Sequence, residues 1–345
     1  MRVALIGFGS VGRALATLLE SRRDELYARM GLSPKLVCVM DSQGAAVSHS
    51  GLSAPTLLET KTSTGSVSNL PGAGVKLSGI ADETRLIKDV HADVVIESSP
   101  SALTNPTPAF ERMKAAMASR KHVITVNKAP LAVAMPALVE LAKFNRVQLR
   151  YSGTVGAGTP VLASARTLAA GDTILKIRGI MNGTTNFILW RMSQQGDTYA
   201  NALAEATRLG YAETDPTTDV DGIDTATKVV ILANAILRLG ATVKDVKIAG
   251  IRDYPKNRID EAASRSESIK LIGEIDAGSR TLSVSPQAVP RYGPMDVPAA
   301  LNAVQFTLKS AGEVTLVGRG AGGPETATAI LRDLTDIWHA AGVVH

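Results

Sequence analysis

The sequence contains a single cysteine, a formal net charge of only +5 and no long run of apolar residues. Cys38 has no partner for a disulfide within the chain, and the apolar segment around it predicts a buried strand position. The 37 Lys and Arg residues are scattered rather than gathered in a stripe, so nucleic-acid binding is not indicated. No apolar stretch has the length of a membrane span, and no charged leader with a cleavage site precedes the first strand. We therefore expect a cytoplasmic protein that binds neither nucleic acid nor membranes.

Internal repeats are also absent, and the only compositionally biased segment is one connection rich in Ser, Thr and Gly. Hydrophobic residues make up 45% of the chain and charged residues 20%, which is typical of a folded globular protein and not of a disordered or fibrous one. A length of 345 residues favours two domains. The small positive net charge is compatible either with binding of anionic ligands or with an ordinary solvated surface.

Residues 1–151 alternate short apolar runs with longer helix-compatible stretches, a pattern that predicts a Rossmann-type, doubly wound parallel sheet of the α/β class. The predicted strands are Val3–Ile6, Leu36–Met40, Asp93–Glu97, His122–Val126 and Val147–Tyr151. The predicted helices are Val11–Met30, Pro108–Ser119 and Met135–Asn145. We interpret Ser42–Gly79 as an elaborated surface connection with one short helix near residues 54–60, or as a mobile flap over a cofactor.

The pattern changes after residue 151, and residues 152–318 predict a second, α+β domain. Its predicted strands are Ile174–Met181, Thr281–Ser285, Ala303–Leu308 and Val314–Gly318. Its predicted helices are Phe187–Gln194, Tyr199–Leu209 and Gly222–Leu239. Residues 319–345 contain an amphipathic helix over Glu325–Ala341, which we expect to return to the first domain.

A glycine fingerprint follows the first predicted strand and opens the first predicted helix, which is the setting that dinucleotide binding requires. The glycines permit a tight turn, close approach of the backbone to a pyrophosphate, and close helix packing, while the helix N-terminus favours anionic charge. The predicted cofactor-binding residues of this turn are Gly7, Phe8, Gly9, Ser10, Val11 and Gly12.

Positions at and after the ends of the second and third predicted strands concern the same cofactor. Asp41 ends the second predicted strand, where a carboxylate either accepts hydrogen bonds from the adenosine ribose or merely caps the next turn. An Asp here favours NAD over NADP, although Lys61 in the following connection could reach a 2′-phosphate. Ser98 and Ser99 end the third strand, near the expected nicotinamide ribose, or form a simple turn.

A segment with five carboxylates in twelve residues, Glu213–Asp224, leads directly into the Gly222–Leu239 helix. Asp219 and Asp221 could act as a substrate site or as helix caps and dipole partners. Asp224 and Lys228 are four residues apart on the helix, so their side chains share one face. Because the remainder of the helix is nearly all apolar, Lys228 is predicted to be desolvated, which suits proton transfer to an alkoxide.

Other exposed-backbone loops supply further candidates. Asn127 and Lys128 follow the fourth predicted strand at the carboxyl edge, where ligands bind in open α/β sheets, although Lys128 could also be a solvated surface lysine. Asn182–Asn186 offers amides and hydroxyls for an amino-acid carboxylate. The backbone carbonyls of Thr154–Pro160 could hold a hard cation. Both loops could also be plain turns.

These motifs, in this order along nearly the whole chain, resemble homoserine dehydrogenase. The most specific part is the combination of Gly210–Pro216 with Asp219–Lys228. Gly320–Gly323, before the last helix, is similar to the point where the family's chain returns to the cofactor domain, and it adds Gly322 as a cofactor-binding candidate. The resemblance implies NAD(P)-dependent interconversion of L-aspartate 4-semialdehyde and L-homoserine, in threonine, methionine and isoleucine biosynthesis.

The resemblance also implies residue roles. Lys228 would handle the hydroxyl proton, Asp224 would hold Lys228 and the substrate in place, and Lys128 would assist near the nicotinamide. The implied amino-acid pocket is formed by Gly183, Thr184, Tyr211, Glu213 and Asp219. A monovalent cation such as sodium would be bound by the backbone carbonyls of Val155, Ala157 and Thr159. A homodimer is what the family implies.

The sequence departs from the family pattern at two points, and two alternative functions are also considered. Ser152 stands where relatives often have Glu, which weakens the cation prediction, and the sequence stops at His345 without an appended ACT domain, so feedback inhibition through such a domain is not expected. Aspartate-semialdehyde dehydrogenase would need a catalytic thiol, and Cys38 lies in a predicted core strand. A dinucleotide-sensing protein on the same scaffold would bind cofactor without turnover.

Overall fold

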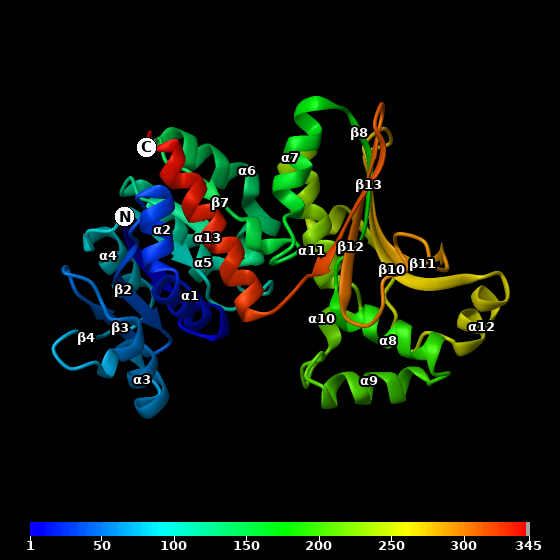
Figure 1. Cartoon of the computed structure of the whole chain (residues 1–345), viewed down its shortest axis with the longest axis horizontal. Coiled ribbons are helices and arrows are strands. Elements are labelled where there is room, and N and C mark those ends of the chain that lie inside the picture. Colours follow the sequence, from blue (N-terminus) through cyan, green and yellow to red (C-terminus); the bar gives the residue numbers. More distant parts are fainter. Residues whose placement is uncertain (343–345) are drawn as a thin grey trace. The chain divides into compact units, whose positions relative to one another are not determined.

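The computed structural model describes residues 1–342 and divides into two compact units (Figure 1). Unit 1 contains Met1–Thr154 and the C-terminal segment that begins at Gly322, and unit 2 contains Val155–Ala321. Both units combine helices with a sheet, so the predicted α/β class with a second α+β part is confirmed. Within residues 1–342, no helix has both the length and the apolar composition that crossing a membrane requires.

Unit 1 contains a seven-stranded sheet in the order β4-β3-β2-β1-β5-β6-β7. The strands are β1 Arg2–Ile6, β2 Lys35–Asp41, β3 Gly44–Val47, β4 Gly74–Lys76, β5 Val94–Glu97, β6 His122–Thr125 and β7 Leu149–Arg150. The five strands from β2 to β7 in this order are parallel, and β3 and β4 extend the sheet in antiparallel fashion. Strands β1 and β5 are almost completely buried because a parallel sheet is covered on both faces.

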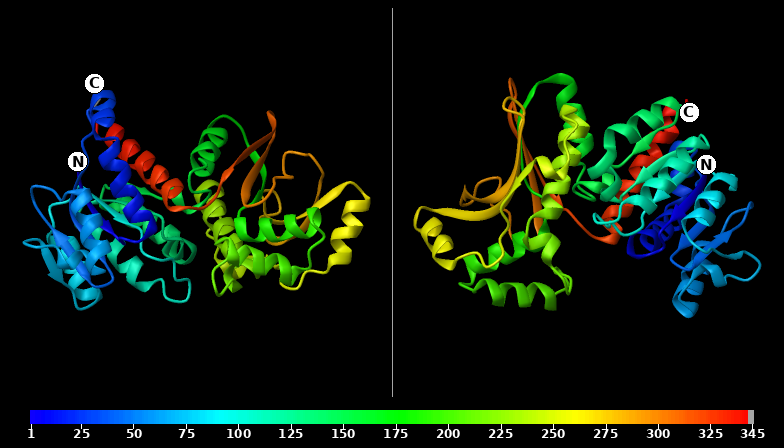
Figure 2. Two further views of the ribbon diagram at one scale, coloured as in Figure 1. Left: turned by 60° about the horizontal axis from the view of Figure 1, so that its bottom comes forward. Right: turned by 180° about the vertical axis from the view of Figure 1, so that it is seen from behind.

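The helices of unit 1 are α1 Ser10–Ser21, α2 Arg23–Met30, α3 Ala54–Thr64, α4 Ile80–Asp89, α5 Thr107–Ala118, α6 Lys128–Phe144 and α13 Gly323–Ala340, with short turns η1 Val67–Asn69 and η2 Ser152–Thr154. The C-terminal helix α13 lies along α1, as the views in Figures 1 and 2 agree. The indole N–H of Trp338 donates to the carbonyl of Met30 at 2.8 Å. Although α13 is distant in sequence, its apolar face is therefore part of the core of unit 1.

Two expectations for unit 1 were wrong. The predicted single helix Val11–Met30 is broken at Arg22, whose φ of −108° and ψ of 10° leave the helical region while its guanidinium binds Glu25. The segment Ser42–Gly79 is more than a surface connection, because it contributes β3 and β4 to the sheet and buries Ala45 and Val67. Its strands are short and lack apolar alternation, so the pairing comes from backbone hydrogen bonds that composition does not reveal.

Unit 2 contains a six-stranded sheet in the order β13-β12-β8-β10-β11-β9, antiparallel except for the parallel pair β11 and β9. The strands are β8 Ile174–Ile180, β9 Val246–Ile248, β10 Glu267–Asp276, β11 Thr281–Pro290, β12 Leu301–Leu308 and β13 Gly312–Arg319. The helices are α7 Val161–Gly171, α8 Gly183–Gln194, α9 Tyr199–Arg208, α10 Thr217–Val220, α11 Ile223–Leu232 and α12 Lys256–Ser264, with the π-helical η3 Ala233–Leu237 and the turn η4 Val243–Asp245.

Helices α8, α11 and α12 pack against β10, one of the two central strands and one that the sequence pattern did not predict. The predicted helix Gly222–Leu239 ends earlier than expected, because the α-helix passes into η3 after Leu232 and stops at Arg238 in the left-handed region. All ten residues of α11 except Ile223 are buried, and this burial includes Asp224 and Lys228. A charged pair is thus held inside unit 2.

Candidate active site

The glycine fingerprint occupies the turn from β1 into α1. Gly7 has φ +93°, and a Cβ there would lie 2.6 Å from the backbone of Ser98 and Ser99. A Cβ on Gly12 would lie 2.2 Å from the Gly7 carbonyl oxygen, so both positions require glycine. A Cβ on Gly9, in contrast, would meet nothing within 4 Å. The space in front of Gly9, at the uncapped N-terminus of α1, is open for close approach of a ligand.

Neighbouring positions of the fingerprint are tied to the rest of unit 1. Phe8 is buried in the core, and Val11 packs against the same core. A Cβ on Gly323 would lie 2.6 Å from the Ser10 hydroxyl oxygen, so the N-terminus of α13 adjoins the fingerprint. Gly322, the residue before α13, has φ +120°, a conformation that favours glycine.

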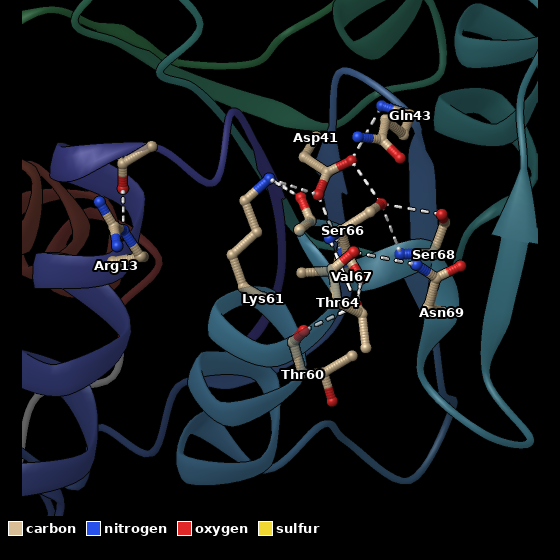
Figure 3. Close-up of polar contacts among 12 residues, drawn as sticks. Arg13, Asp41, Gln43, Thr60, Lys61, Thr64, Ser66, Val67, Ser68 and Asn69 are labelled. Carbon is tan, nitrogen blue, oxygen red and sulfur yellow. Dashed lines mark hydrogen bonds and ion pairs between the residues drawn. The ribbon is translucent and has the colours of Figure 1, made fainter.

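Asp41, at the end of β2, is the acceptor at the centre of a polar network (Figure 3). One carboxylate oxygen accepts the Gln43 amide and the Ser66 hydroxyl, both at 2.9 Å. The other accepts the Lys61 ammonium and the Val67 amide, again at 2.9 Å. Burial alone would raise the pKa of Asp41, but these donors outweigh it and the pKa is lowered. The carboxylate is therefore ionised and surrounded by donors suited to an anion.

The ends of β5 and β6 meet at one edge of the sheet, as predicted for parallel neighbours. The Ser98 hydroxyl donates to the carbonyls of Ile6 and Gly7 at 2.9 Å, so Ser98 braces the fingerprint turn. The Asn127 side-chain amide donates to the Ser99 carbonyl at 3.3 Å, and its oxygen accepts the Ala129 amide as the N-cap of α6. These contacts bring Ser98, Ser99 and Asn127 together.

Lys128 is the first residue of α6 and is partly exposed, with its backbone N–H bound to the Ser101 hydroxyl at 2.9 Å.

The sequence motifs did not identify Glu97 as a site residue. Glu97 is fully buried at the end of β5 and accepts hydrogen bonds from the amide and hydroxyl of Ser99. Burial raises the pKa of Glu97. A charged residue at the end of an apolar strand was the only signal in the sequence that could have identified it.

In unit 2, Lys228 and Asp224 form a buried ion pair, with 2.7 Å between Lys228 Nζ and Asp224 Oδ2. Their side chains are only 8% and 10% exposed, so solvent screens the pair weakly. Lys228 Nζ also donates to the Met181 carbonyl at 2.6 Å. Two acceptors thus fix the position of the ammonium group at the end of β8.

Asn182 connects this pair to the acidic segment, a role that the sequence did not indicate. Its side-chain amide donates to Asp224 Oδ2 at 3.0 Å and to Asp219 Oδ1 at 2.6 Å. Its Oδ1 accepts the Thr185 amide at 2.9 Å and caps α8. Burial and the nearby Asp224 raise the pKa of Asp219, while hydrogen bonds from Asn182 and Thr184 oppose the increase. The Asn182 side-chain amide thus lies between the Asp219 and Asp224 carboxylates and donates to both.

The other predicted pocket residues lie around the N-terminus of α8 and the segment before α10. The Thr184 hydroxyl donates to the Tyr211 carbonyl at 2.6 Å. Tyr211 is 45% exposed, and the centroid of its ring lies 4.8 Å from that of the Phe187 ring. Glu213 is exposed on the same segment, close in sequence to Tyr211. Gly183 opens α8, and its backbone lies against Ala300.

Two members of the acidic segment have structural partners instead. Asp221 binds the Arg252 guanidinium at 2.7 and 2.8 Å, and Asp215 accepts the Thr217 amide at 3.1 Å. Helix α11 starts after Gly222, which has φ +83° and no side-chain cap. The helix-cap interpretation of Asp219 and Asp221 therefore does not hold for α11.

The cation candidates Val155 and Ala157 are buried, and Ala157 has φ +45°. The Thr159 carbonyl accepts the Val161 amide at 2.8 Å. Ser152, where the family often has Glu, donates its hydroxyl to Asp333 of α13 at 2.6 Å. Among residues 1–342, no group of three or more His, Cys, Asp or Glu side chains is arranged to hold a metal ion.

Comparison with known proteins agrees with this geometry. Residues 7–152 match the model of the homoserine dehydrogenase NAD-binding domain, and residues 160–335 match the model of homoserine dehydrogenase. Homoserine dehydrogenase of Methanocaldococcus jannaschii is 42% identical over 99% of both chains, and the NAD(+)-dependent homoserine dehydrogenase of Pseudomonas canavaninivorans is 39% identical over 99% of this chain and 97% of its own. A hyperthermophilic archaeal homoserine dehydrogenase solved in complex with NADPH has a TM-score of 0.84 and 29% identity, covering 98% of each chain.

These matches exclude the aspartate-semialdehyde dehydrogenase alternative, in line with Cys38, which is 1% exposed and whose pKa is raised to about 12 by burial. The matched residues 7–152 contain the glycine fingerprint, and the matched residues 160–335 contain the buried ion pair of Lys228 and Asp224. The chain therefore belongs to the homoserine dehydrogenase family of NAD(P)-dependent oxidoreductases.

Proposed function

We propose that the chain interconverts L-aspartate 4-semialdehyde and L-homoserine with NAD(P), supplying homoserine for the biosynthesis of threonine, methionine and isoleucine. The observation that carries the proposal is the buried ion pair of Lys228 and Asp224, joined through Asn182 to Asp219. A desolvated lysine suits proton transfer to and from the substrate oxygen. The neighbouring carboxylates suit a substrate that carries an ammonium group. A simple cofactor-binding protein has no need of this arrangement.

The proposed mechanism divides proton and hydride transfer between the protein and the cofactor. When bound, the cofactor supplies the hydride that adds to the aldehyde carbon. Lys228 Nζ stabilises the charge that develops on the aldehyde oxygen and donates the proton that completes the alcohol. Asp224 accepts a hydrogen bond from Lys228 and keeps its ammonium oriented. We assign Lys128 an assisting role near the nicotinamide.

The amino-acid end of the substrate is assigned to Gly183, Thr184, Tyr211, Glu213 and Asp219. A carboxylate such as that of Asp219 suits the substrate ammonium group, and the amides at the N-terminus of α8 suit the substrate carboxylate. Support comes from the hydrogen bond between Thr184 and the Tyr211 carbonyl, which ties the two segments together.

The dinucleotide is assigned to the turn from β1 to α1, with Asp41 binding the adenosine ribose and Ser98, Ser99, Asn127 and Gly322 completing the site. The open space at Gly9 supports contact with a pyrophosphate. We propose a preference for NAD, because the ionised Asp41 carboxylate would repel the 2′-phosphate of NADP. We further propose that the enzyme is a homodimer.

A monovalent cation such as sodium is proposed at the carbonyls of Val155, Ala157 and Thr159, since backbone carbonyls are ligands of hard cations. The fit is partial, because the Thr159 carbonyl already accepts the Val161 amide and Ser152 brings no carboxylate. We therefore derive no step of the reaction from the cation. Replacing choline chloride with sodium chloride at constant ionic strength should produce a saturable rise in kcat/KM, and a flat response would contradict the site.

The activity is tested by mixing the purified protein with L-homoserine and either NAD or NADP and following the absorbance of the reduced cofactor. Formation of reduced cofactor with at least one of them supports the proposed function. Cofactor binding, measured by calorimetry, without any turnover would instead favour the dinucleotide-sensing alternative. Separate titrations of the two cofactors give the preference directly.

Asn182→Ser should move the acid limb of the kcat/KM profile to higher pH by about one unit. The Asn182 amide lowers the pKa of Asp219, so its loss raises that pKa and Asp219 becomes protonated at a higher pH. A hydrogen bond to a charged group contributes about 1.5 to 3 kcal/mol, and one pKa unit corresponds to about 1.4 kcal/mol. Since serine remains a good N-cap, α8 should be retained.

Asn182→Asp provides the second arm of this experiment. It keeps the cap on Thr185 but places a third carboxylate where the amide donor was, so the acid limb should move further in the same direction. Lower activity with an unchanged pH profile in both variants would reduce Asn182 to a purely structural residue.

A further inference from the structure

Lys270 is a buried lysine that the proposed chemistry does not use. It lies in the middle of β10, is 2% exposed, and donates from Nζ to the Val297 carbonyl at 2.7 Å and to Asn186 Oδ1 at 3.1 Å. Asp296 Oδ1 lies 3.5 Å from the same nitrogen. Taking a lysine out of water is costly unless its hydrogen bonds are satisfied. The burial of Lys270 is therefore offset by its contacts with Asn186 and the Val297 carbonyl, both of which lie outside β10.

Asn186, on α8, makes a matching set of contacts. It is fully buried, and its side-chain nitrogen donates to the carbonyls of Val297 at 3.1 Å, Ala299 at 2.8 Å and Leu301 at 3.0 Å. Lys270 and Asn186 together thus hold the 296–301 segment, which leads into β12. Because Lys270 also binds Asn186 Oδ1, the strand, the helix and the segment share one hydrogen-bond network.

The 296–301 segment is held against the N-terminus of α8. A Cβ on Gly183 would lie 2.8 Å from the Ala300 carbonyl oxygen, so the two backbones are in close contact. Ala299 adopts φ +50°, a conformation that costs energy for a residue other than glycine and persists only where the surroundings impose it. The hydrogen bond from Asn186 to the Ala299 carbonyl is such a restraint.

We propose that Lys270, acting through Asn186, is a positioning residue that holds the 296–301 segment against Gly183 and thereby sets the geometry of the pocket for the amino-acid end of homoserine. The inference rests on the proposed function, which assigns Gly183 and Thr184 to that pocket. Lys270 touches neither of these residues through the contacts described above, so its effect is transmitted by the segment. A shifted segment would weaken binding of the α-carboxylate and leave proton transfer at Lys228 in place.

The test is Lys270→Met, which keeps an unbranched side chain of similar size but removes the charge and the donors. Removing the ammonium leaves Asn186 Oδ1, the Val297 carbonyl and Asp296 without their donor, which lowers the midpoint of thermal unfolding, so the kinetics are measured well below the midpoint of each variant. The KM for homoserine should rise about tenfold while kcat falls much less, which indicates lost ground-state binding. The Kd for NAD should remain unchanged, because the cofactor residues belong to unit 1.

Asn186→Asp and Lys309→Met complete the design. Asn186→Asp keeps an acceptor for Lys270 but removes the donors to three carbonyls, so the same rise in KM is expected. Lys309 is an exposed lysine of the same unit, and Lys309→Met should leave the KM for homoserine unchanged. An unchanged KM in Lys270→Met and Asn186→Asp, with a lower unfolding midpoint alone, would overturn the positioning role.

Calorimetric binding of homoserine to the unmodified protein and to the same variants separates this inference from the proposed function. If the unmodified protein binds homoserine without oxidising it, the proposed activity fails, whereas weaker binding in Lys270→Met and Asn186→Asp still supports positioning. If the unmodified protein is active and the variants bind homoserine equally well, the positioning role fails and the proposed function stands.

Discussion

Lys228→Met should lower kcat for homoserine oxidation by about 10³-fold while the Kd for the cofactor stays within a factor of two. Positioned acid–base groups contribute roughly 10² to 10⁴-fold to rate, and the buried Lys228 is bound to both Asp224 and the Met181 carbonyl. Its loss should affect the transition state and not the cofactor residues of unit 1. Initial rates at saturating homoserine, with cofactor binding measured separately, give both quantities.

This experiment needs controls for stability, because the methionine leaves Asp224 as a buried charge without its ion-pair partner. Such a charge can cost about 3 to 5 kcal/mol, so thermal unfolding of the variant should be measured alongside activity. The double variant Asp224→Asn, Lys228→Met removes the remaining charge and should recover stability but not activity. Lys247→Met, at an exposed lysine of β9, should behave as the unmodified protein. An equal loss in cofactor affinity and in kcat would contradict the catalytic role of Lys228.

Asp41→Ser should shift cofactor use toward NADP by about 10²-fold in the ratio of kcat/KM values. Four donors converge on the Asp41 carboxylate, and two of them are the Lys61 ammonium and the Ser66 hydroxyl (Figure 3). A short neutral side chain leaves these donors available for a 2′-phosphate and removes a repulsive charge. Such like-charge contacts cost several kcal/mol, and each 1.4 kcal/mol is a factor of ten.

Lys61→Met in the Asp41→Ser background provides the matched test of this explanation. If Lys61 is the phosphate partner, the double variant should lose most of the gain with NADP while its kcat/KM for NAD changes little. A preference for NADP in the unmodified protein, or no change in the ratio on Asp41→Ser, would exclude Asp41 as the discriminating residue.

The sequence predicted the parallel part of unit 1 well because four of its five strands, β1, β2, β5 and β6, are apolar runs that are mostly buried. The fingerprint could be predicted for the same kind of reason, since Gly7 and Gly12 are required by local backbone contacts. Strands β3 and β4 escaped prediction because short segments of small and polar residues carry no alternation. Strand β10 was not predicted because its buried positions include Ser268 and Lys270, which interrupt the apolar pattern.

By itself, the sequence determined the local geometry of the residues to which the proposed chemistry is assigned. The spacing of Asp224 and Lys228 places them on one helical face, because an α-helix returns to the same side after four residues. Gly7 and Gly12 likewise specify a turn in which a Cβ at either position would collide with neighbouring backbone. These are local properties, and local backbone geometry is what a sequence pattern encodes.

The tertiary structure decided the environment of those residues. Asn182 and Asp224 are 42 positions apart, and Asn186 and Lys270 are 84 apart, so each contact exists only because β8, α8, α11 and β10 pack together. Burial then turns an ordinary i, i+4 ion pair into a desolvated lysine with fixed partners, because charges interact strongly where water is excluded. Desolvation depends on the whole fold and not on the spacing of two residues.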